Sequence, residues 1–558
     1  MTRELNLTDI QGNVTRAYGR YSFPFARYFF FHIEDPAAGR AFVDEVRKKV
    51  TTAARWGEDL PRPDCTTNIA FTFMGLWMLE LPVRTLQGMP DVFAEGMKAR
   101  AFVLGDRDQT QTQKEAEEED WDAKWDPLWQ DNREAGSGGK NDVHLWVSLN
   151  AQLAEPFGMN PHPELEERTK WLMGLCDDKG VRLLARNGPK GDQPYQDASA
   201  VFDDLDGAVV PTPKEHFGFT DGIGNPVFEG QYPKEAEKVA VIGRGKRMGK
   251  GWEPLATGEF ILGHPDESQE LPPTSMPPEF MHNGTFFAYR KLHENVGSFN
   301  EVLEEEAEAY AATMGVGKEQ ARETLMASMC GRWSDGVPMA LVPTYDEWIK
   351  FGQERRFRGE GVEPLEGYKN QLTYIASPEA SDFRFADDMA GLKCPGGAHL
   401  RRVNTRDYMD PLNAFGVDQK TGTQPANKNA ATALNKRRRI LRRGLPYGGP
   451  AWEEKTDKTE QGVIMIIMGT SLFRQFEFVQ QQWIQYGLDF HQGNNTCPLL
   501  GNHDHHKRHT IPADPSTGKP TYVMSKLKTF VECRGGDYFF VPSMTALRMI
   551  AMGIVDPT

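Results

Sequence analysis

Short apolar and aromatic runs alternate with polar turns along the 558-residue chain. The run at 27–34 (RYFFFHIE) is rich in residues that favour strands and ends at a turn signal, so it predicts a β-strand. Asp35 and Pro36 suit the N-cap and first turn of a helix, which the pattern continues to residue 50. The apolar positions of that helix are Phe42, Val43, Val46 and Val50.

Further strands are predicted by apolar runs in both halves of the chain, at residues 68–73, 142–149, 462–468 and 537–542. An Ala/Glu-rich segment at 300–315 predicts a helix between them. Strands and helices that alternate with short connections are typical of an α+β fold. At 558 residues the chain is also too long for one ordinary core.

Three segments interrupt this pattern. Residues 106–140 are polar and acidic, and we expect a surface excursion there. The tryptophans expected to anchor it are Trp121, Trp125 and Trp129. Residues 226–390 are rich in Pro and Gly turns and are predicted to form an inserted region that packs on the core. Residues 417–437 contain few apolar side chains and predict a loop.

The charge balance is acidic, with a net charge of −15 and a pI near 5.5. Nucleic acids and acidic membranes attract basic surfaces, so neither is an expected partner. The six cysteines are scattered without a CxxC pair, which favours free thiols in a reducing compartment. The first residues hold no apolar signal segment, and no window approaches about 18 consecutive apolar residues. A cytoplasmic protein without a membrane span is therefore predicted.

Three short motifs carry the candidate chemistry: GFTDG at 218–222, CPGGAHLRR at 394–402 and RILRRG at 439–444. They supply an acid, an imidazole and guanidinium groups, which are the groups that a haem peroxidase needs. Together and in this order they resemble the dye-decolourising peroxidases. The resemblance extends over nearly the whole chain, through segments 9–19, 68–71, 283–290, 331–333, 474–483 and 534–542.

The resemblance, which is to the longer bacterial and fungal-type branch, implies two ferredoxin-like domains with antiparallel sheets, as in the dimeric α+β barrel superfamily. We expect an N-terminal ferredoxin-like domain at 1–225 and a C-terminal, haem-binding ferredoxin-like part at 391–558, with 226–390 inserted between them. The family implies haem b as cofactor, hydrogen peroxide as oxidant, and bulky organic donors such as dyes and phenols. It leaves a homo-oligomer open. The alternatives are a haem-binding or haem-trafficking protein with incidental peroxidase activity, and a metal-dependent hydrolase.

Asp221 is the predicted distal acid/base, since one positioned carboxylate can take a proton from bound peroxide and return it to the leaving oxygen. An ordinary Asp-Gly turn is the alternative that composition alone favours. Arg442 is predicted to stabilise the charge that develops on peroxide. Strand alternation puts Arg442 and Arg443 on opposite faces without choosing between them, and the resemblance favours Arg442. A nucleic-acid patch at 436–443 is the competing interpretation, which the acidic chain weakens.

His399 is the predicted iron ligand, because neutral imidazole suits iron and the surrounding motif matches the family's ligand motif. Gly222 would let the backbone approach the porphyrin closely. Met465 would line the distal pocket, and a buried core strand explains that position equally well. The arginines that could meet the haem propionates are Arg401, Arg402 and Arg406, with a solvated basic turn as the alternative.

The chain departs from its relatives at Cys497, where they often carry an aspartate before proline. A carboxylate bonded to a metal-binding imidazole raises the basicity of that ligand. Such a partner is therefore either missing here or supplied by Glu477 or Asp489. The histidines at 503–509 form a second candidate metal cluster, weighed against a solvated loop, and would be the basis of the hydrolase alternative.

Overall fold

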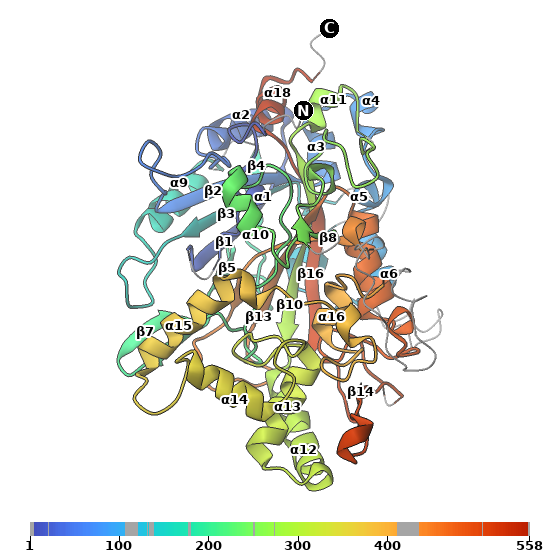
Figure 1. The fold of residues 1–558 in the computed structure, drawn as a ribbon. Helices are drawn as coiled ribbons and strands as arrows, with labels where there is room; N and C mark the ends of the chain where they lie inside the picture. The colour runs from blue at the N-terminus through green and yellow to red at the C-terminus, as the bar shows by residue number, and fades with distance from the viewer. Residues whose placement is uncertain are drawn as a thin grey trace.

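The fold is centred on one ten-stranded antiparallel sheet, in which strands from both halves of the chain lie side by side (Figure 1). This computed structural model describes residues 5–19, 22–106, 121–130, 132, 139–176, 180–248, 251–272, 274–409, 435–504 and 506–555. The strand order is β11-β13-β10-β16-β2-β3-β1-β4, with β12 paired to β13 and β5 paired to β1.

The strands of the central sheet are β1 (Phe25–Ile33), β2 (Cys65–Phe71), β3 (Leu145–Ala151), β4 (Val181–Leu183), β5 (Gln196–Ser199), β10 (Thr285–Glu294), β11 (Leu441–Arg443), β12 (Pro446–Tyr447), β13 (Gly462–Gly469) and β16 (Val531–Val541). Three small hairpins pair β6 (Phe202–Leu205) with β7 (Ala208–Pro211), β8 (Lys246–Met248) with β9 (Gly251–Glu253), and β14 (His509–Ile511) with β15 (Tyr522–Met524).

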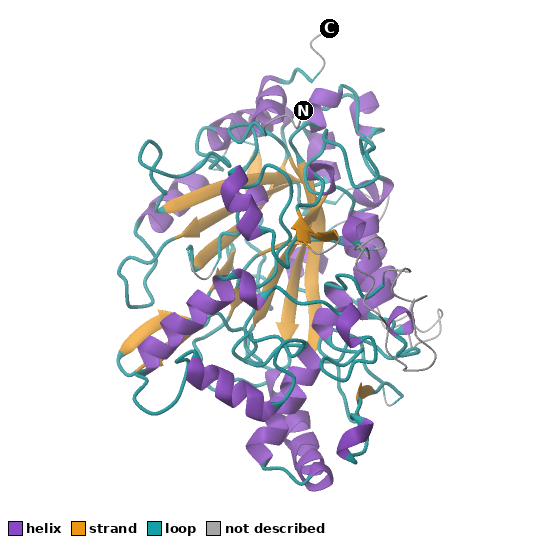
Figure 2. Cartoon of the chain, viewed as in Figure 1, coloured by secondary structure: helices purple, strands orange, loops and turns teal. Residues whose placement is uncertain are grey.

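Helices surround the sheet (Figure 2). They are α1 (Gly12–Thr15), α2 (Pro36–Arg47), α3 (Phe73–Met78), α4 (Val83–Leu86), α5 (Asp91–Glu95), α6 (Ala101–Leu104), α8 (Pro127–Gln130), α9 (Glu164–Gly174), α10 (Lys234–Ala240), α11 (Pro278–Met281), α12 (Val296–Met314), α13 (Lys318–Cys330), α14 (Tyr345–Glu354), α15 (Pro364–Ala376), α16 (His399–Val403) and α18 (Met544–Met552). Two π-helical segments, η6 (Leu472–Glu477) and η7 (Val479–Ile484), follow β13.

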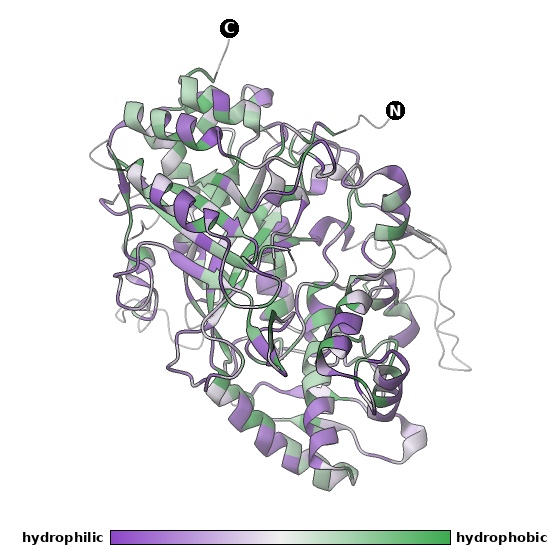
Figure 3. Ribbon diagram, turned by 90° about the vertical axis from the view of Figure 1, so that its left-hand side faces the viewer, coloured by the Kyte–Doolittle hydropathy of each residue, from purple (hydrophilic) through white to green (hydrophobic). Residues whose placement is uncertain are grey.

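The predicted N-terminal strand and helix are confirmed as β1 and α2. The Asp35 side chain accepts a hydrogen bond from the Ala38 amide at 2.7 Å, and Pro36 occupies the first helical position. The helix buries Phe42, Val43 and Val46, and it ends at Arg47, so Val50 lies beyond it. Apolar residues gather on the central strands (Figure 3). This burial of one helix face against the sheet follows from the helical spacing of the apolar positions.

The two halves of the sheet meet where β16 pairs with β2, at Phe540 and Phe71. The prediction that 226–390 is an inserted region that packs on the core does not hold for β10, which is part of the central sheet and pairs with β13 on one side and β16 on the other. The aromatic run of β10 is buried along almost its whole length, and this strand signal outweighs the Pro and Gly turns around it. Helices α12 to α15 of the same region lie toward the lower end of Figure 1.

Three other predictions bear on the surface. Trp125 and Trp129 are buried, and the Trp121 ring lies 5.1 Å from that of Trp125, so these side chains anchor residues 121–130, the described stretch in the middle of the acidic segment. Most of the loop predicted at 417–437 lies outside the described residues. Within the described part of the chain, no helix is long and apolar enough to cross a membrane.

Candidate active site

Asp221 lies in a loop that follows the β6–β7 hairpin and is held by hydrogen bonds at both ends. The Thr220 hydroxyl donates to the carbonyl of Ser334 at 2.7 Å, and the Asp221 amide donates to the carbonyl of Pro213 at 2.9 Å. Gly222 has a φ of +82°, a left-handed conformation that glycine adopts without strain. The loop therefore turns directly after Asp221 and leaves that carboxylate fixed in place.

Arg442 is the central residue of β11, and its side chain reaches the loop. Its Nη1 donates to Asp221 Oδ1 at 2.6 Å, and the two side chains are 27% and 26% exposed. Arg443 points the other way and is buried, where it donates to the carbonyls of Asn13 and Val14. Strand alternation thus gives the two arginines different surroundings, and only Arg442 pairs with the acid.

His399 is the first residue of α16 and faces a cavity. Burial lowers the pKa of its imidazole to about 4, with a further contribution from the Arg442 charge, so the ring is neutral at neutral pH. Its Nδ1 lies 3.3 Å from the Sγ of Cys497. A neutral imidazole with one ring nitrogen already engaged presents the other nitrogen, Nε2, to a metal.

The cavity has two adjoining parts of about 950 and 160 Å³, and both are lined by His399, Arg442 and Met465. Asp221 lines the smaller part. Sites for small molecules and cofactors occupy roughly 300–1,000 Å³, so the space suits a large cofactor. Met465 is thus where the sequence predicted it, on the cavity wall. Gly222 instead borders a neighbouring cavity.

Three buried arginines have no carboxylate ion-pair partner among the described residues: Arg332, Arg406 and Arg439. Arg332 and Arg439 line the smaller part of the cavity, and their charges act on Arg406, which lines neither part. Nη2 of Arg332 and both Nε and Nη2 of Arg406 are buried without a hydrogen-bond partner. Burial lowers the pKa of all three, to about 10 for Arg332 and Arg439. Unpaired buried cations are costly, so the two arginines that line the cavity, Arg332 and Arg439, fit the propionates of haem. Arg406, which the sequence also proposed for this role, does not line the cavity.

Arg401 and Arg402 do not take the predicted place beside the propionates. Neither lines the cavity. Arg401 is fully buried, pairs with Asp388 at 2.7 Å, and stacks on the ring of Phe385. Arg402 donates to four backbone carbonyls, those of Gly397, Trp483, Tyr486 and Asn495. Sequence reasoning placed these two side chains by their nearness to His399, whereas a helical turn of α16 points them into the protein.

The carboxylates proposed to support His399 are engaged elsewhere. Glu477 accepts hydrogen bonds from Arg100 and from the Tyr538 hydroxyl, the latter at 2.7 Å. Asp489 accepts a hydrogen bond from the Trp483 indole at 3.0 Å. Cys497, which is fully buried, is the side chain in contact with the imidazole.

Glu215 is a cavity residue that the motif search missed. It lines the smaller part of the cavity together with Asp221 and Glu294, and its carboxylate accepts the amides of Phe217 and Phe219 at 2.9 and 2.7 Å. Burial raises the pKa of Glu215 to about 7, and the nearby Asp221 charge acts in the same direction. Its position three residues before Gly218, just ahead of the GFTDG motif, is the only signal in the sequence.

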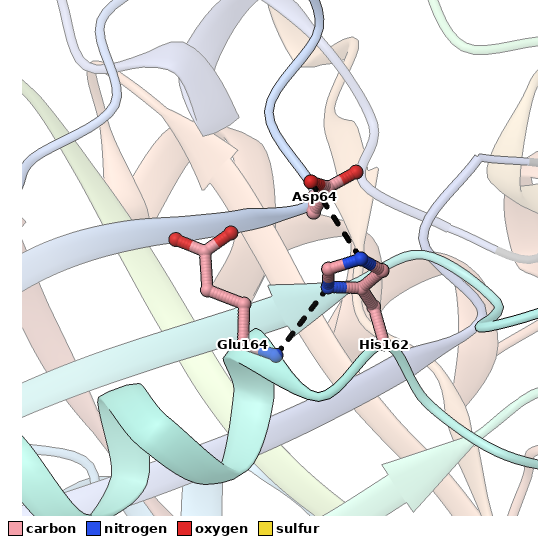
Figure 4. A group of neighbouring side chains, drawn as sticks. All are labelled: Asp64, His162 and Glu164. Carbon is pink, nitrogen blue, oxygen red and sulfur yellow. Dashed lines mark hydrogen bonds and ion pairs between the residues drawn. The ribbon is translucent and has the colours of Figure 1, made fainter.

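Two other groups of possible metal ligands are less suited to hold a metal than the cavity around His399. Within the described part of 503–509, His503 contacts Cys497 O at 3.1 Å, and no ligand set forms around it; His505 lies outside the described residues. Asp64, His162 and Glu164 do come together (Figure 4). However, His162 Nδ1 accepts the Glu164 amide at 3.3 Å, and the Glu164 carboxylate pairs with Arg168 at 2.6 Å. This cluster is therefore explained by internal hydrogen bonds and an ion pair.

The fold and the cavity together define an α+β protein that offers a nitrogen ligand, an acid–guanidinium pair and unpaired arginines to one large anionic cofactor. Residues 9–136 match the family described as the DyP dimeric alpha+beta barrel domain. Peroxidase 2 of Mycetinis scorodonius is 26% identical over 98% of this chain and 87% of its own length. The multifunctional dye peroxidase DyP2 of an Amycolatopsis species is 25% identical over 60% of this chain and 61% of its own.

Solved structures agree on the fold. The fungal DyP-type peroxidase from Auricularia auricula-judae superposes with a TM-score of 0.65 at 21% identity, covering 99% of this chain and 100% of the other. An ancestral D-type dye decolorizing peroxidase superposes with a TM-score of 0.65 at 22% identity, covering 98% of this chain and 99% of the other. The chain is therefore similar over nearly its whole length to dye-decolourising peroxidases.

Proposed function

We propose that this chain is a haem-dependent peroxidase that reduces hydrogen peroxide and oxidises bulky organic donors such as dyes and phenols. The observation that carries the proposal is the 2.6 Å pair between Asp221 and Arg442 in the cavity that His399 also lines. The relatives named as dye-decolorizing peroxidases support it, as does a structural relative solved in complex with 2,6-dimethoxyphenol.

Haem b is the cofactor. His399 would hold the iron, and Arg332 and Arg439 would meet the propionates, because these two cations line the cavity and have no ion pair with a carboxylate among the described residues. When bound, haem supplies the redox chemistry with peroxide that no amino-acid side chain provides.

Asp221 accepts a proton from one oxygen of peroxide and returns it to the other, which leaves as water. The fixed loop holds the carboxylate where this transfer takes place. Arg442 stabilises the negative charge on peroxide as the oxygen–oxygen bond breaks. Its backbone amide donates to the Asn225 side chain at 2.8 Å, and its Nη2 reaches the Ile223 carbonyl at 3.4 Å, so the loop and β11 position the guanidinium together.

On the Nδ1 side of the His399 imidazole lies the thiol of Cys497, at a position where a carboxylate would make the ligand more basic. Sulfur is a weak hydrogen-bond acceptor, so Cys497 draws the Nδ1 proton less strongly than a carboxylate does. The ligand nitrogen of His399 is therefore a weaker electron donor. We expect a higher reduction potential than the same site would have with an aspartate.

The experiment that tests the function uses the haem-loaded protein, hydrogen peroxide and 2,6-dimethoxyphenol. We expect multiple turnovers in the wild type and a large loss of turnover in the Asp221→Asn variant with its haem still bound. A haem-trafficking protein with incidental activity would oxidise the phenol slowly, and replacement of Asp221 would change nothing. That second result would reject the enzyme in favour of the carrier.

The cellular location is a separate proposal. All six cysteines are free, and four of them have a pKa that burial raises well above its ordinary value: Cys65, Cys330, Cys394 and Cys533. Free thiols persist in reducing compartments, so we place the protein in the cytoplasm. Fractionation of the native host, with the protein found in an exported fraction, would contradict this.

A further inference from the structure

A second cavity of about 750 Å³ borders the loop that carries Asp221, and it shares Ile223, Gly224 and Asn225 with the smaller part of the His399 cavity. It is bordered by Gly222 to Asn225, by the N-terminal segment around α1, and by the last turn of α15. The charged residues that line it are four arginines: Arg16, Arg55, Arg244 and Arg443. We call this space the arginine cavity. Among its described lining residues there is no Asp, Glu, Lys or His.

None of these four guanidinium groups takes part in an ion pair among the described residues. Each donates to backbone carbonyls: Arg16 to Ala53 and Ala54, Arg55 to Gly230 and Gln231, Arg244 to Asn225, and Arg443 to Asn13 and Val14. A carbonyl satisfies a donor but leaves the positive charge uncompensated. In a chain with a net charge of −15, such a local concentration of like charge attracts anions strongly.

An acidic side chain near Arg55, Glu237, does not line the cavity. The charge of Arg55 acts on Glu237, whose carboxylate accepts the Gly230 amide at 2.9 Å and does not line the space. Elsewhere in the molecule arginines do find carboxylates, as Arg290 finds Asp106 in a buried pair. The lack of a carboxylate is thus a local property of this cavity.

Aromatic side chains give the same space an apolar wall. Tyr18, Trp56 and Tyr232 all line it. The Arg16 guanidinium lies 4.2 Å from the centre of the Trp56 ring, which in turn stacks on Tyr18 with centroids 6.2 Å apart. A cavity with both cationic and aromatic walls recognises a ligand that has both a negative group and a planar ring.

We propose that the arginine cavity binds anionic aromatic molecules, of the class of aromatic sulfonates and carboxylates, and that it admits electron donors of this class. The second half of the statement rests on the proposed peroxidase function, and the first half does not. This cavity has room for a bulky aromatic molecule and borders the loop that follows Asp221.

Hydrogen bonds also connect the arginine cavity to the segment that holds Arg442. Arg244 Nε donates to the Asn225 carbonyl at 2.9 Å, while the Asn225 side chain accepts the Arg442 amide at 2.8 Å. Arg443 donates to the Arg442 carbonyl at 2.9 Å. A molecule held by these arginines therefore rests against the same backbone that positions the catalytic guanidinium.

Calorimetric titration of the haem-loaded protein with naphthalene-2-sulfonate tests the binding. Arg55 is exposed, so Arg55→Glu should fold normally and reverse one of the four charges. We expect its dissociation constant to rise at least about tenfold, or about 1.4 kcal/mol. Arg84→Glu, at an exposed arginine on α4, changes the net charge equally and should leave the constant within about twofold. Trp56→Leu should weaken the naphthalene compound but not inorganic sulfate.

Unchanged affinity in both Arg55→Glu and Trp56→Leu would overturn the site, and so would sulfate binding as tightly as the naphthalene compound. The link to turnover is tested separately. Arg55→Glu should raise KM for a sulfonated dye and leave KM for 2,6-dimethoxyphenol unchanged. If the sulfonate binds as expected while the wild type oxidises nothing, the peroxidase function fails and the binding site stands.

Discussion

The two sides of the His399–Asp221 cavity differ in charge, in exposure and in what holds them. Asp221 and Arg442 form an ion pair with about a quarter of each side chain exposed, and a loop and an edge strand carry them. His399 meets the neutral, fully buried Cys497 at 3.3 Å. The first side is built to move a proton and stabilise charge, and the second to hold a neutral ligand without adding charge. Mutations on the two sides should therefore have separable effects.

The largest expected effect is on the His399 side. His399→Ala removes the strongest ligand that the cavity offers to iron, so we expect haem retention to fall to a small fraction of the wild-type level. Haem content per protein after purification measures this. His491→Ala, at an exposed histidine outside the cavity, is the matched control and should keep its haem. Full occupancy in His399→Ala with an unchanged absorption spectrum would reject the ligand assignment.

The next largest effect is on the Asp221 side and should leave haem in place. Asp221→Asn and Arg442→Leu should each slow the reaction with peroxide by at least ~100-fold, the scale of one acid/base or electrostatic group. Stopped-flow absorption after mixing with peroxide measures the rate.

Arg443→Leu is the control for that pair. It breaks hydrogen bonds to three carbonyls, of Asn13, Val14 and Arg442, so it should lower the melting temperature rather than the rate of the peroxide reaction. If Arg442→Leu reacts with peroxide at the wild-type rate, while Arg443→Leu is stably folded but reacts slowly, Arg443 rather than Arg442 is the catalytic arginine.

The comparison of the two sides also shows what a sequence can predict. The acid, the imidazole and the distal arginine were found because each lies in a compact motif, and strand and helix signals around them are local. Cys497 meets His399 across 98 residues of chain, and the contact depends on how α16 and the segment after η7 pack. Arg439 opens the RILRRG motif and Arg332 lies in the segment 331–333, but neither motif indicated a role for these two side chains. Their place in the cavity wall, with backbone carbonyls as hydrogen-bond acceptors, follows from the fold rather than from the local sequence.

One substitution would make the His399 side of the cavity resemble the Asp221 side by giving it a carboxylate. Cys497→Asp places a carboxylate against Nδ1, where it should make the imidazole a stronger electron donor and lower the iron reduction potential. Spectroelectrochemical titration of the haem-loaded protein gives the potential, and the iron–histidine stretching frequency in the ferrous state should rise as the potential falls. Cys497→Ser, a neutral replacement, should shift both readouts far less. Equal values in all three proteins would mean that the 3.3 Å contact does not tune the ligand.

The smallest expected effect concerns stability rather than chemistry. Burial raises the pKa of Glu215 to about 7, above the value near 4.5 expected in the unfolded chain. The folded state therefore holds a proton that the unfolded state releases, so this group favours folding below pH 4.5 and loses that contribution as pH rises through about 7. Glu215→Gln removes the titration. Its melting temperature should therefore fall less between pH 5 and pH 8 than that of the wild type. The comparison must use the haem-loaded protein at both pH values, because haem binding itself stabilises the fold. An identical pH dependence in the two proteins would show that Glu215 is already ionised in the folded state, and that the cavity carries one more negative charge beside Asp221 than its burial implies.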